Sequence, residues 1–258
     1  MPVPLFAVCQ LSIVPVRLEV GHSSEITSQV RCGEGVEILD TSGNRARVRV
    51  LSDDYEGWID LRQFTPPAAA RPPVATCITD DDCCMATCGG RRMLLPLGTP
   101  LPNWENGSFL LGAERWSWPG QVRPLSAQQP PDTAAVLEYA HRYLHTAYLW
   151  GGRSLFGIDC SGLVQAVFQA HGQRLLRDSI MQMTQGTAVK DLAAARPGDL
   201  VFFNCAGDVG RHVGLLLSCG TIIHASAMVR VDDITDAGIR HRGTGEITHH
   251  ITAIRRFF

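Results

Sequence analysis

The sequence lacks the features of a membrane-spanning or nucleic-acid-binding protein. No apolar run approaches the roughly 18 to 20 residues that a membrane-spanning helix needs. The N-terminal stretch MPVPLFAVCQLSIVPVRLEV has no basic segment followed by a continuous apolar one. No block of Lys and Arg breaks the balance of 23 basic and 25 acidic side chains, so no nucleic-acid partner is expected.

Signs of disorder are also missing. The chain has 258 residues, of which 45% are hydrophobic, enough for one large domain or two to three small ones. We therefore expect a globular monomer. Its expected location is the cytoplasm, or the periplasm or cell envelope if a signal peptide has been removed.

The cysteines cannot all pair within one chain, because nine is an odd number. Free cysteine packs as a small apolar residue, so we expect most of them to be buried in a reducing setting. The cysteines in apolar or strand-like segments are Cys9, Cys32, Cys77, Cys160, Cys205 and Cys219.

Three further thiols, Cys83, Cys84 and Cys88, lie within the run DDCCMATC. Structural zinc sites normally have a second cysteine pair or downstream histidines at a defined spacing, and that second half is absent here. We expect these thiols to pack in a strand or loop. No metal and no cofactor is predicted.

The composition divides the chain into three parts. Residues 1–66 contain the short alternating segments VEILD, ARVRVL and GWIDL between turn signals, which predicts a small β module. PPAAARPP at 66–73 has the composition of a stiff linker. Residues 67–127, with FLLG and RWSWPG as expected strand ends, form a second β module.

The third part, residues 128–258, has the pattern of an α+β domain. Asp132 is placed to cap a first helix, and 161–170 is predicted as a second, ended by Gly172. The segments DLVFF, HVGLLL, TIIHAS, MVRV and ITAIRRFF then read as strands. Because the predicted helices precede the predicted strands, an α+β fold with helices and strands in separate parts of the domain is favoured over a parallel βαβ sheet.

Cys160 lies at the start of the second predicted helix, in the stretch GIDCSGLVQAVF. Unpaired backbone N–H groups and the positive end of the helix dipole meet there, so the position predicts a lowered thiol pKa and a nucleophile. The alternative is that Cys160 is a buried structural residue.

A cysteine nucleophile needs a base, and the base needs a third group to orient it. His212 begins HVGLLL and His224 lies near the end of TIIHAS, with a turn between the two strands. Adjacent antiparallel strands would place these rings side by side. The other histidines, including His249, lie on helix faces or in a polar loop and strand start, and none is expected to take part.

These motifs in this order resemble the NlpC-type cysteine peptidases, a papain-like bacterial family that cuts cell-wall peptides. The resemblance rests on YLWGG at 148–152, DCSG at 159–162, RPGDLVFF at 196–203, HVGLLL and HAS. It implies that Cys160 is the nucleophile, that His212 is the base and that His224 orients it. It also implies that Tyr148 helps to stabilise the oxyanion; packing beside Trp150 is the alternative.

A narrower resemblance covers the whole chain. Two small SH3-like β-barrel modules before an NlpC-type domain are similar to the γ-D-glutamyl-L-diamino acid endopeptidases that recycle muropeptides. In that subgroup an aspartate and a serine receive the free N-terminal amine of the substrate, and Asp178 and Ser179 of RDSIMQ match them. Tyr55 of YEGW and Glu25 of SEITSQ match residues that the subgroup supplies from its first module.

The remaining candidate substrate-binding residues are Asp159, Ser161 and Arg211, which flank Cys160 and His212. A buried ammonium group needs carboxylate partners, and Asp178 and Glu25 can supply them. The alternatives are that Asp178 caps a short helix and that Glu25 is a solvated surface charge.

The expected activity is hydrolysis of the γ-D-Glu to diamino acid bond of a cell-wall peptide with a free N-terminal L-Ala. Two rival hypotheses stay open. One is an endopeptidase acting on intact peptidoglycan with wall-binding SH3-like modules, and the other is a cell-wall binding protein that no longer cuts.

Overall fold

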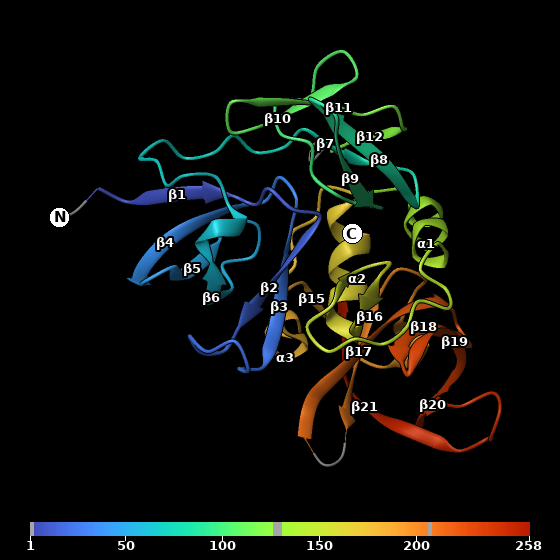
Figure 1. Ribbon diagram of the computed structural model, residues 1–258. Coiled ribbons are helices and arrows are strands. Elements are labelled where there is room, and N and C mark those ends of the chain that lie inside the picture. Colours follow the sequence, from blue (N-terminus) through green and yellow to red (C-terminus); the bar gives the residue numbers. More distant parts are fainter. Residues whose placement is uncertain (1–2, 126–130, 206–207) are drawn as a thin grey trace. The chain divides into compact units, whose positions relative to one another are not determined.

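β-strands make up most of the chain and helices are few (Figure 1). The protein is represented by a computed structural model that describes residues 3–125, 131–205 and 208–258. Its residues cluster into two compact units, Met1–Ser126 and Ala127–Phe258. Within the described ranges, no helix has the length and apolar character needed to cross a membrane.

The first unit begins with a six-stranded antiparallel sheet in the order β1-β4-β5-β6-β2-β3. Strict alternation builds its core: Ala46 and Val48 are fully buried, whereas Arg47 between them is exposed. The predicted segments VEILD, ARVRVL and GWIDL fall in β4 to β6. The strands are β1 (Leu5–Val8), β2 (Ile13–Arg17), β3 (Ile26–Arg31), β4 (Gly35–Ser42), β5 (Arg45–Val50) and β6 (Glu56–Asp60), and the short helix η1 (Leu61–Gln63) follows.

The same unit contains a four-stranded sheet, β10-β11-β8-β9, and a two-stranded one, β12-β7. Phe109, Leu95 and Trp116 form much of their core, and Cys32 from the end of β3 packs into it. The two sets of strands thus share buried side chains. The strands are β7 (Cys77–Thr79), β8 (Cys83–Cys88), β9 (Arg91–Pro96), β10 (Ser108–Leu111), β11 (Glu114–Ser117) and β12 (Val122–Pro124).

The proline-rich segment between these sets is not a free spacer throughout. Ala68 pairs with Phe6 by two backbone hydrogen bonds of 2.8 and 2.9 Å. Its middle therefore adds to the edge of the first sheet. Most of the remaining linker residues are exposed.

The three clustered thiols lie along a single strand, β8. Cys84 and Cys88 share the face that packs on the core of the second module, whereas Cys83 is exposed. Among the described residues, no group of three or more His, Cys, Asp or Glu side chains is arranged to hold a metal ion.

The first helix of the second unit begins at the predicted residue, and the second begins one residue before its predicted start. Asp132 accepts a hydrogen bond from the Ala134 N–H at the start of α1 (Thr133–His141). Cys160 is the first residue of α2 (Cys160–Gln169), and a short third helix, α3 (Ser179–Gln182), follows. The 3-10 turn η2 (Leu192–Ala194) precedes the long strands.

A seven-stranded antiparallel sheet in the order β15-β21-β16-β17-β18-β19-β20 completes this unit, and α2 packs on β17 and β18 (Figure 1). All five predicted strands are present and several are longer than predicted, whereas β15 and β20 were not predicted. The strands are β13 (Arg153–Ser154) and β14 (Gly157–Ile158), which form a separate pair, and β15 (Thr187–Val189), β16 (Leu200–Cys205), β17 (Asp208–Ser218), β18 (Thr221–Ser226), β19 (Met228–Thr235), β20 (Gly238–Arg240) and β21 (Ile247–Arg256).

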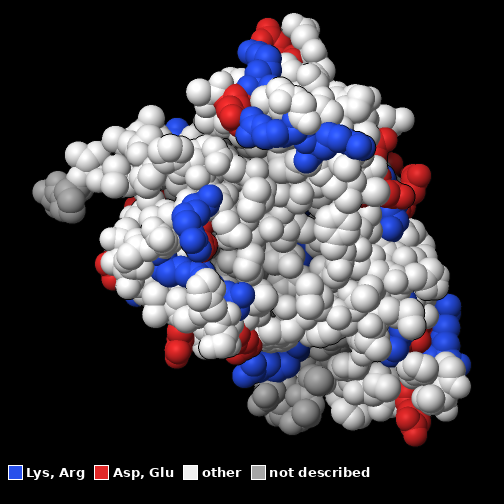
Figure 2. All heavy atoms as spheres, viewed as in Figure 1, with Lys and Arg blue, Asp and Glu red and all other residues white. Residues whose placement is uncertain are grey.

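Charged side chains form no large patch of one sign on the face that Figure 2 shows. Arg and Lys lie in small groups, several of them beside Asp or Glu. This distribution agrees with the balanced composition of the chain.

Candidate active site

The nucleophile candidate is fixed at the N-terminus of α2. Asp159 is the N-cap residue, and its Oδ1 accepts a hydrogen bond of 2.7 Å from the Gly162 N–H. Its other oxygen, Oδ2, accepts one of 2.8 Å from the Gly151 N–H. One carboxylate thus joins the first turn of the helix to the loop that carries Tyr148.

Close backbone packing explains the glycines of the motifs at 148–152 and 159–162. A Cβ atom on Gly162 would lie 2.3 Å from the carbonyl oxygen of Gly152, and one on Gly152 would lie 2.4 Å from that of Gly157. Only glycine permits such an approach. The loop therefore contacts the helix through backbone atoms.

Asp159 and Ser161, both predicted to bind substrate, belong to a buried network with Arg177. The guanidinium donates to Asp159 Oδ2 at 2.5 Å and to Ser161 Oγ at 2.8 Å. Arg177 is 1% exposed and Asp159 4%. In this structure they hold α2 and the segment before α3 together, and a contact with substrate stays a prediction for both.

The two predicted histidines lie side by side on neighbouring strands. Gly214 of β17 is directly opposite His224 of β18, which places His212 diagonally across from His224 on the same face. His212 Nε2 lies 2.8 Å from His224 Nδ1, and the two rings are nearly perpendicular at 87°. The pairing predicted from the spacing is confirmed.

The Cys160 sulfur contacts the backbone of this same strand. The backbone N–H groups of Val213 and Ser161 lower the pKa of the thiol, which places the sulfur beside the residue that follows His212. Cys160 is 5% exposed and His212 also 5%. The candidate nucleophile and the candidate base therefore both lie in a buried site.

The predicted lowering of the Cys160 pKa is wrong for this structure. Burial raises the pKa of the thiol to about 12, and the neighbouring Asp159 carboxylate adds to that shift. The two backbone N–H groups and Arg177 act in the opposite direction but do not outweigh it. The resting thiol is protonated, because the helix start that supplies N–H donors is also buried.

His212 rests in its neutral form. Burial, and then the nearby His224, His249 and Arg230, hold its pKa well below the usual range. A neutral imidazole is what a general base requires. The site thus pairs a neutral thiol with a neutral base.

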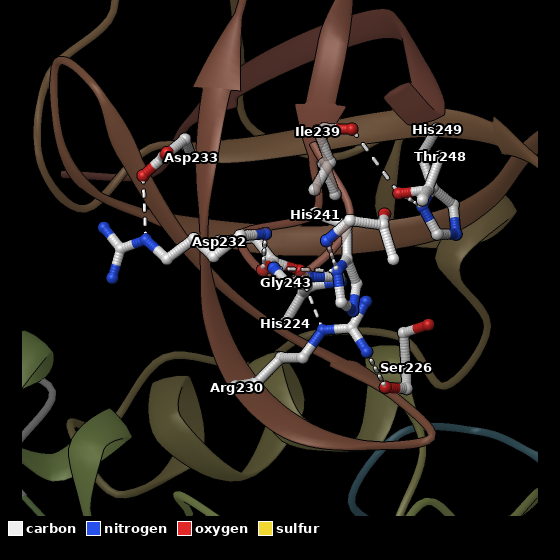
Figure 3. Close-up of polar contacts among 12 residues, drawn as sticks. His224, Ser226, Arg230, Asp232, Asp233, Ile239, His241, Gly243, Thr248 and His249 are labelled. Atoms are coloured by element: carbon white, nitrogen blue, oxygen red, sulfur yellow. Dashed lines mark hydrogen bonds and ion pairs between the residues drawn. The ribbon is translucent and has the colours of Figure 1, made fainter. Parts of the chain in front are cut away.

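Three residues of this site were missed from the sequence: Asp232, Arg230 and His249. His224 Nε2 lies 3.0 Å from Asp232 Oδ2, which also accepts a hydrogen bond of 2.8 Å from Arg230 Nε (Figure 3). His249, which was not expected to take part, stacks on His212 at 4.2 Å between ring centroids. The alternation of Arg230 and Asp232 along a strand was the available signal, but only the register of β18 and β19 assigns them to His224.

Tyr148 and Arg211 have different environments. Tyr148 is half-buried, and its N–H donates to the Ala227 carbonyl at 2.9 Å, which fixes the loop against the end of β18. Arg211 is exposed on β17, directly before His212. The oxyanion role of Tyr148 and the substrate role of Arg211 stay predictions.

Asp178 and Ser179 lie at the start of α3. Asp178 occupies the N-cap position, but its side chain accepts no capping hydrogen bond within this described helix. The capping alternative therefore lacks the bond that would define it. Ser179 is 8% exposed.

Tyr55 and Glu25 belong to the first compact unit, whereas Cys160 and both histidines belong to the second. Tyr55 is half-buried against the core of the first sheet, and Glu25 is exposed directly before β3. Their predicted action on the substrate of Cys160 stays a prediction.

Comparison with known proteins assigns the family. The sequence profile of the NlpC/P60 family matches residues 145–248, and that of the bacterial dipeptidyl-peptidase Sh3 domain matches residues 16–64. A γ-D-glutamyl-L-lysine dipeptidyl-peptidase of Bacillus subtilis (strain 168) is 30% identical over 224 residues, which cover 81% of this chain and 75% of that protein. The chain belongs to the NlpC/P60 family.

One further sequence relative and one solved structure are also similar to this chain. A second γ-D-glutamyl-L-lysine dipeptidyl-peptidase, from Bacillus cereus (strain ATCC 10987 / NRS 248), is 25% identical over 264 residues, which cover 90% of this chain and 77% of that one. The crystal structure of an NlpC/P60 family protein from Bacillus cereus ATCC 10987 superposes with a TM-score of 0.78 at 18% identity, covering 98% of this chain and 99% of that one. The predicted family and its first SH3 module are confirmed, whereas the SH3-like character of the second module stays a prediction.

Proposed function

We propose that the protein is a cysteine endopeptidase that hydrolyses the γ-D-Glu to diamino acid bond of cell-wall peptides with a free N-terminal L-Ala. One observation carries the reaction class: the buried Cys160 sulfur lies against the strand of His212, and His212 is paired with His224 at 2.8 Å. The names of the two Bacillus relatives support the bond and the release of a dipeptide.

The acylation step follows from the neutral pair. His212 takes the thiol proton while the Cys160 sulfur attacks the γ-carbonyl carbon of D-Glu, and the resulting oxyanion is stabilised by the Cys160 N–H and Tyr148. The C–N bond then breaks as His212 donates its proton to the α-amine of the diamino acid. The products are a free diamino end and a thioester on Cys160.

Deacylation reverses the proton path. Water attacks the thioester carbon while His212 takes one of its protons, and the C–S bond breaks. His212 gives this proton to the sulfur, and L-Ala-γ-D-Glu leaves as a carboxylate after its new acid group loses the other water proton to solvent. The cycle consumes one water and needs no redox partner.

Recognition of the free amine is assigned to Asp178 and Ser179, with Tyr55 and Glu25 from the first unit. A desolvated α-ammonium requires a carboxylate partner, since an unpaired buried charge is costly. A pocket closed around that amine would exclude peptides still joined to glycan. The expected substrates are therefore trimmed muropeptides, and the expected role is recycling or scavenging.

The test is mass spectrometry of L-Ala-γ-D-Glu peptides that end in lysine or in diaminopimelate, with wild type and Cys160→Ala. Release of the diamino acid by wild type alone supports the reaction class. Loss of cleavage on N-acetylation supports the amine pocket. Preferential cleavage of the muramyl-linked peptide would favour an enzyme of intact peptidoglycan, and cleavage of no peptide would favour a binding protein.

A further inference from the structure

A buried carboxylate lies behind the two histidines. Asp232 on β19 is 1% exposed, and each of its three hydrogen bonds comes from a different group. Oδ2 contacts His224 Nε2 at 3.0 Å and Arg230 Nε at 2.8 Å, and Oδ1 accepts a bond of 3.0 Å from the Arg242 N–H (Figure 3).

Hairpin geometry brings these groups together. His224 on β18 lies directly opposite Arg230 on β19, and Ile222 lies opposite Asp232. Arg230 and Asp232 are two residues apart, so they share the face of the sheet on which His224 lies. The guanidinium therefore reaches the same carboxylate oxygen as the imidazole.

The carboxylate decides which ring nitrogens carry protons. Although burial raises the pKa of Asp232, the hydrogen bonds from His224, Arg242 and Arg230 outweigh it and hold the pKa well below the usual range. An ionised carboxylate only accepts hydrogen bonds, so His224 Nε2 must carry a proton. In a neutral ring, His224 Nδ1 is then an acceptor.

The protonation of His224 in turn determines that of His212. Because His224 Nδ1 accepts, His212 Nε2, 2.8 Å away, must be the donor. The Nδ1 atom of neutral His212 is then unprotonated. It is the only ring nitrogen of His212 left to take the thiol proton.

We propose that Asp232, held by Arg230, is a positioning residue that fixes both histidines in the tautomer with the proton on Nε2. The inference rests on the proposed function, because it supplies the base that a Cys160 peptidase needs. It adds two residues to the reaction machinery, both of which act through His224.

Three neighbours keep both histidines in this tautomer: His249, Arg230 and Arg242. His249 stacks on the face of His212 with 25° between the ring planes, which opposes a flip of the His212 ring. Arg230 and the Arg242 N–H both point hydrogens at Asp232, which opposes protonation of the carboxylate. Reversal of the chain would need several hydrogen bonds to break together.

The experiment reads tautomers directly. Long-range proton–nitrogen NMR of protein labelled with nitrogen-15 histidine distinguishes protonated from unprotonated ring nitrogens, and His212→Gln and His224→Gln variants assign the two rings. In wild type we expect the proton on Nε2 in both. A proton on Nδ1 of His212 in resting wild type would overturn the inference, whatever any variant does.

Asp232→Asn is the matched perturbation. An amide offers one acceptor and one donor group, so it cannot satisfy three donors, and its NH₂ can donate to His224 Nε2. We expect mixed or reversed tautomers and a fall in kcat of about 100-fold with little change in KM. Replacing the aspartate of a catalytic triad lowers kcat by roughly 10⁴-fold. We expect a smaller fall for Asp232→Asn, because Asp232 acts on the base through His224.

Asp233→Asn is the control, since it removes the same charge one residue away, where the carboxylate is 46% exposed and pairs with Arg242. It should keep both the wild-type tautomers and wild-type turnover. Asp232→Glu, which retains a carboxylate, should restore the Nε2 tautomers at least in part. Unchanged tautomers and turnover in Asp232→Asn would overturn the inference.

Failure of the proposed function is separable from failure of this inference. The wild-type spectrum needs no substrate, and the two variants that assign it need not be active. Wild type that holds both Nε2 tautomers but cleaves no peptide would refute the peptidase and leave the role of Asp232 in the histidine pair supported. Wild type that cleaves the peptide with another tautomer would refute the role of Asp232 alone.

Discussion

At the scale of single residues, the active-site pair rests without charge. Since His212 must be neutral to accept a proton and its pKa is held well below the usual range, it stays competent in mild acid. We expect the acid limb of kcat/KM to lie below pH 6.5, the ordinary value for histidine. A pH profile with that limb at or above 6.5 would contradict the assignment.

His249 makes a second prediction at this scale, on stability. Burial lowers its pKa to about 4, so from pH 6.5 down to about 4 the unfolded chain binds a proton that the folded protein does not. Stability conferred by the neutral ring is complete above pH 6.5 and is lost as the pH falls toward 4, by on the order of 2 to 3 kcal/mol. Denaturant titrations across this range measure it.

His249→Gln should flatten that acid dependence. His250→Gln is the control, because His250 is the exposed neighbour on the same strand. Equal slopes in wild type and His249→Gln would show that other groups produce the acid sensitivity.

Sequence reasoning found the candidate nucleophile and both histidines because each has a local signal: a helix start, or a strand next to a turn. Asp232, Arg230 and His249 have no such signal. Their role depends on which strands are neighbours and in what register, and β19, β20 and β21 pair only in the folded sheet. The thiol pKa was mispredicted because a helix start indicates donors but not burial.

At the scale of elements, the contact between α2 and the 148–152 loop is the most constrained. Gly162→Ala would place a methyl group 2.3 Å from the Gly152 carbonyl oxygen. The overpacking is expected to cost about 1 to 3 kcal/mol, more than alanine gains in helix propensity, and to lower activity by moving Cys160. Thermal unfolding and turnover check this.

Gly220→Ala is the matched control. Gly220 lies in the exposed turn between β17 and β18, and a Cβ there has no heavy atom within 4 Å. Its stability should change by no more than about 0.5 kcal/mol. A loss as large as that of Gly162→Ala would mean that the close approach is not the cause.

Elements with a strong period were predictable, and short ones were not. α2 combines a capping aspartate with an apolar helical run, and the strands from β16 to β19 are apolar segments between turn residues. The three-residue strands β15 and β20 have too few residues for a period. They form because β21 and β19 offer them hydrogen-bonding edges.

At the scale of the whole molecule, Tyr55 of the first compact unit is a proposed substrate-binding residue. Tyr55→Phe tests that role, because the ring still packs on the core of the first sheet while the hydroxyl is lost. We expect unchanged thermal stability and a smaller preference for free over N-acetylated peptide. Full retention of the preference would remove Tyr55 from the pocket.

The proposed nucleophile and its proposed base lie 52 positions apart in the chain, on α2 and β17. A nascent chain that has made the helix but not the hairpin of β17 and β18 holds a thiol with no base. Peptidase activity is therefore expected only after β17 and β18 have packed against α2. A chain that has formed the helix alone is thus expected to be inert, because the proposed hydrolysis requires both the helix and the hairpin.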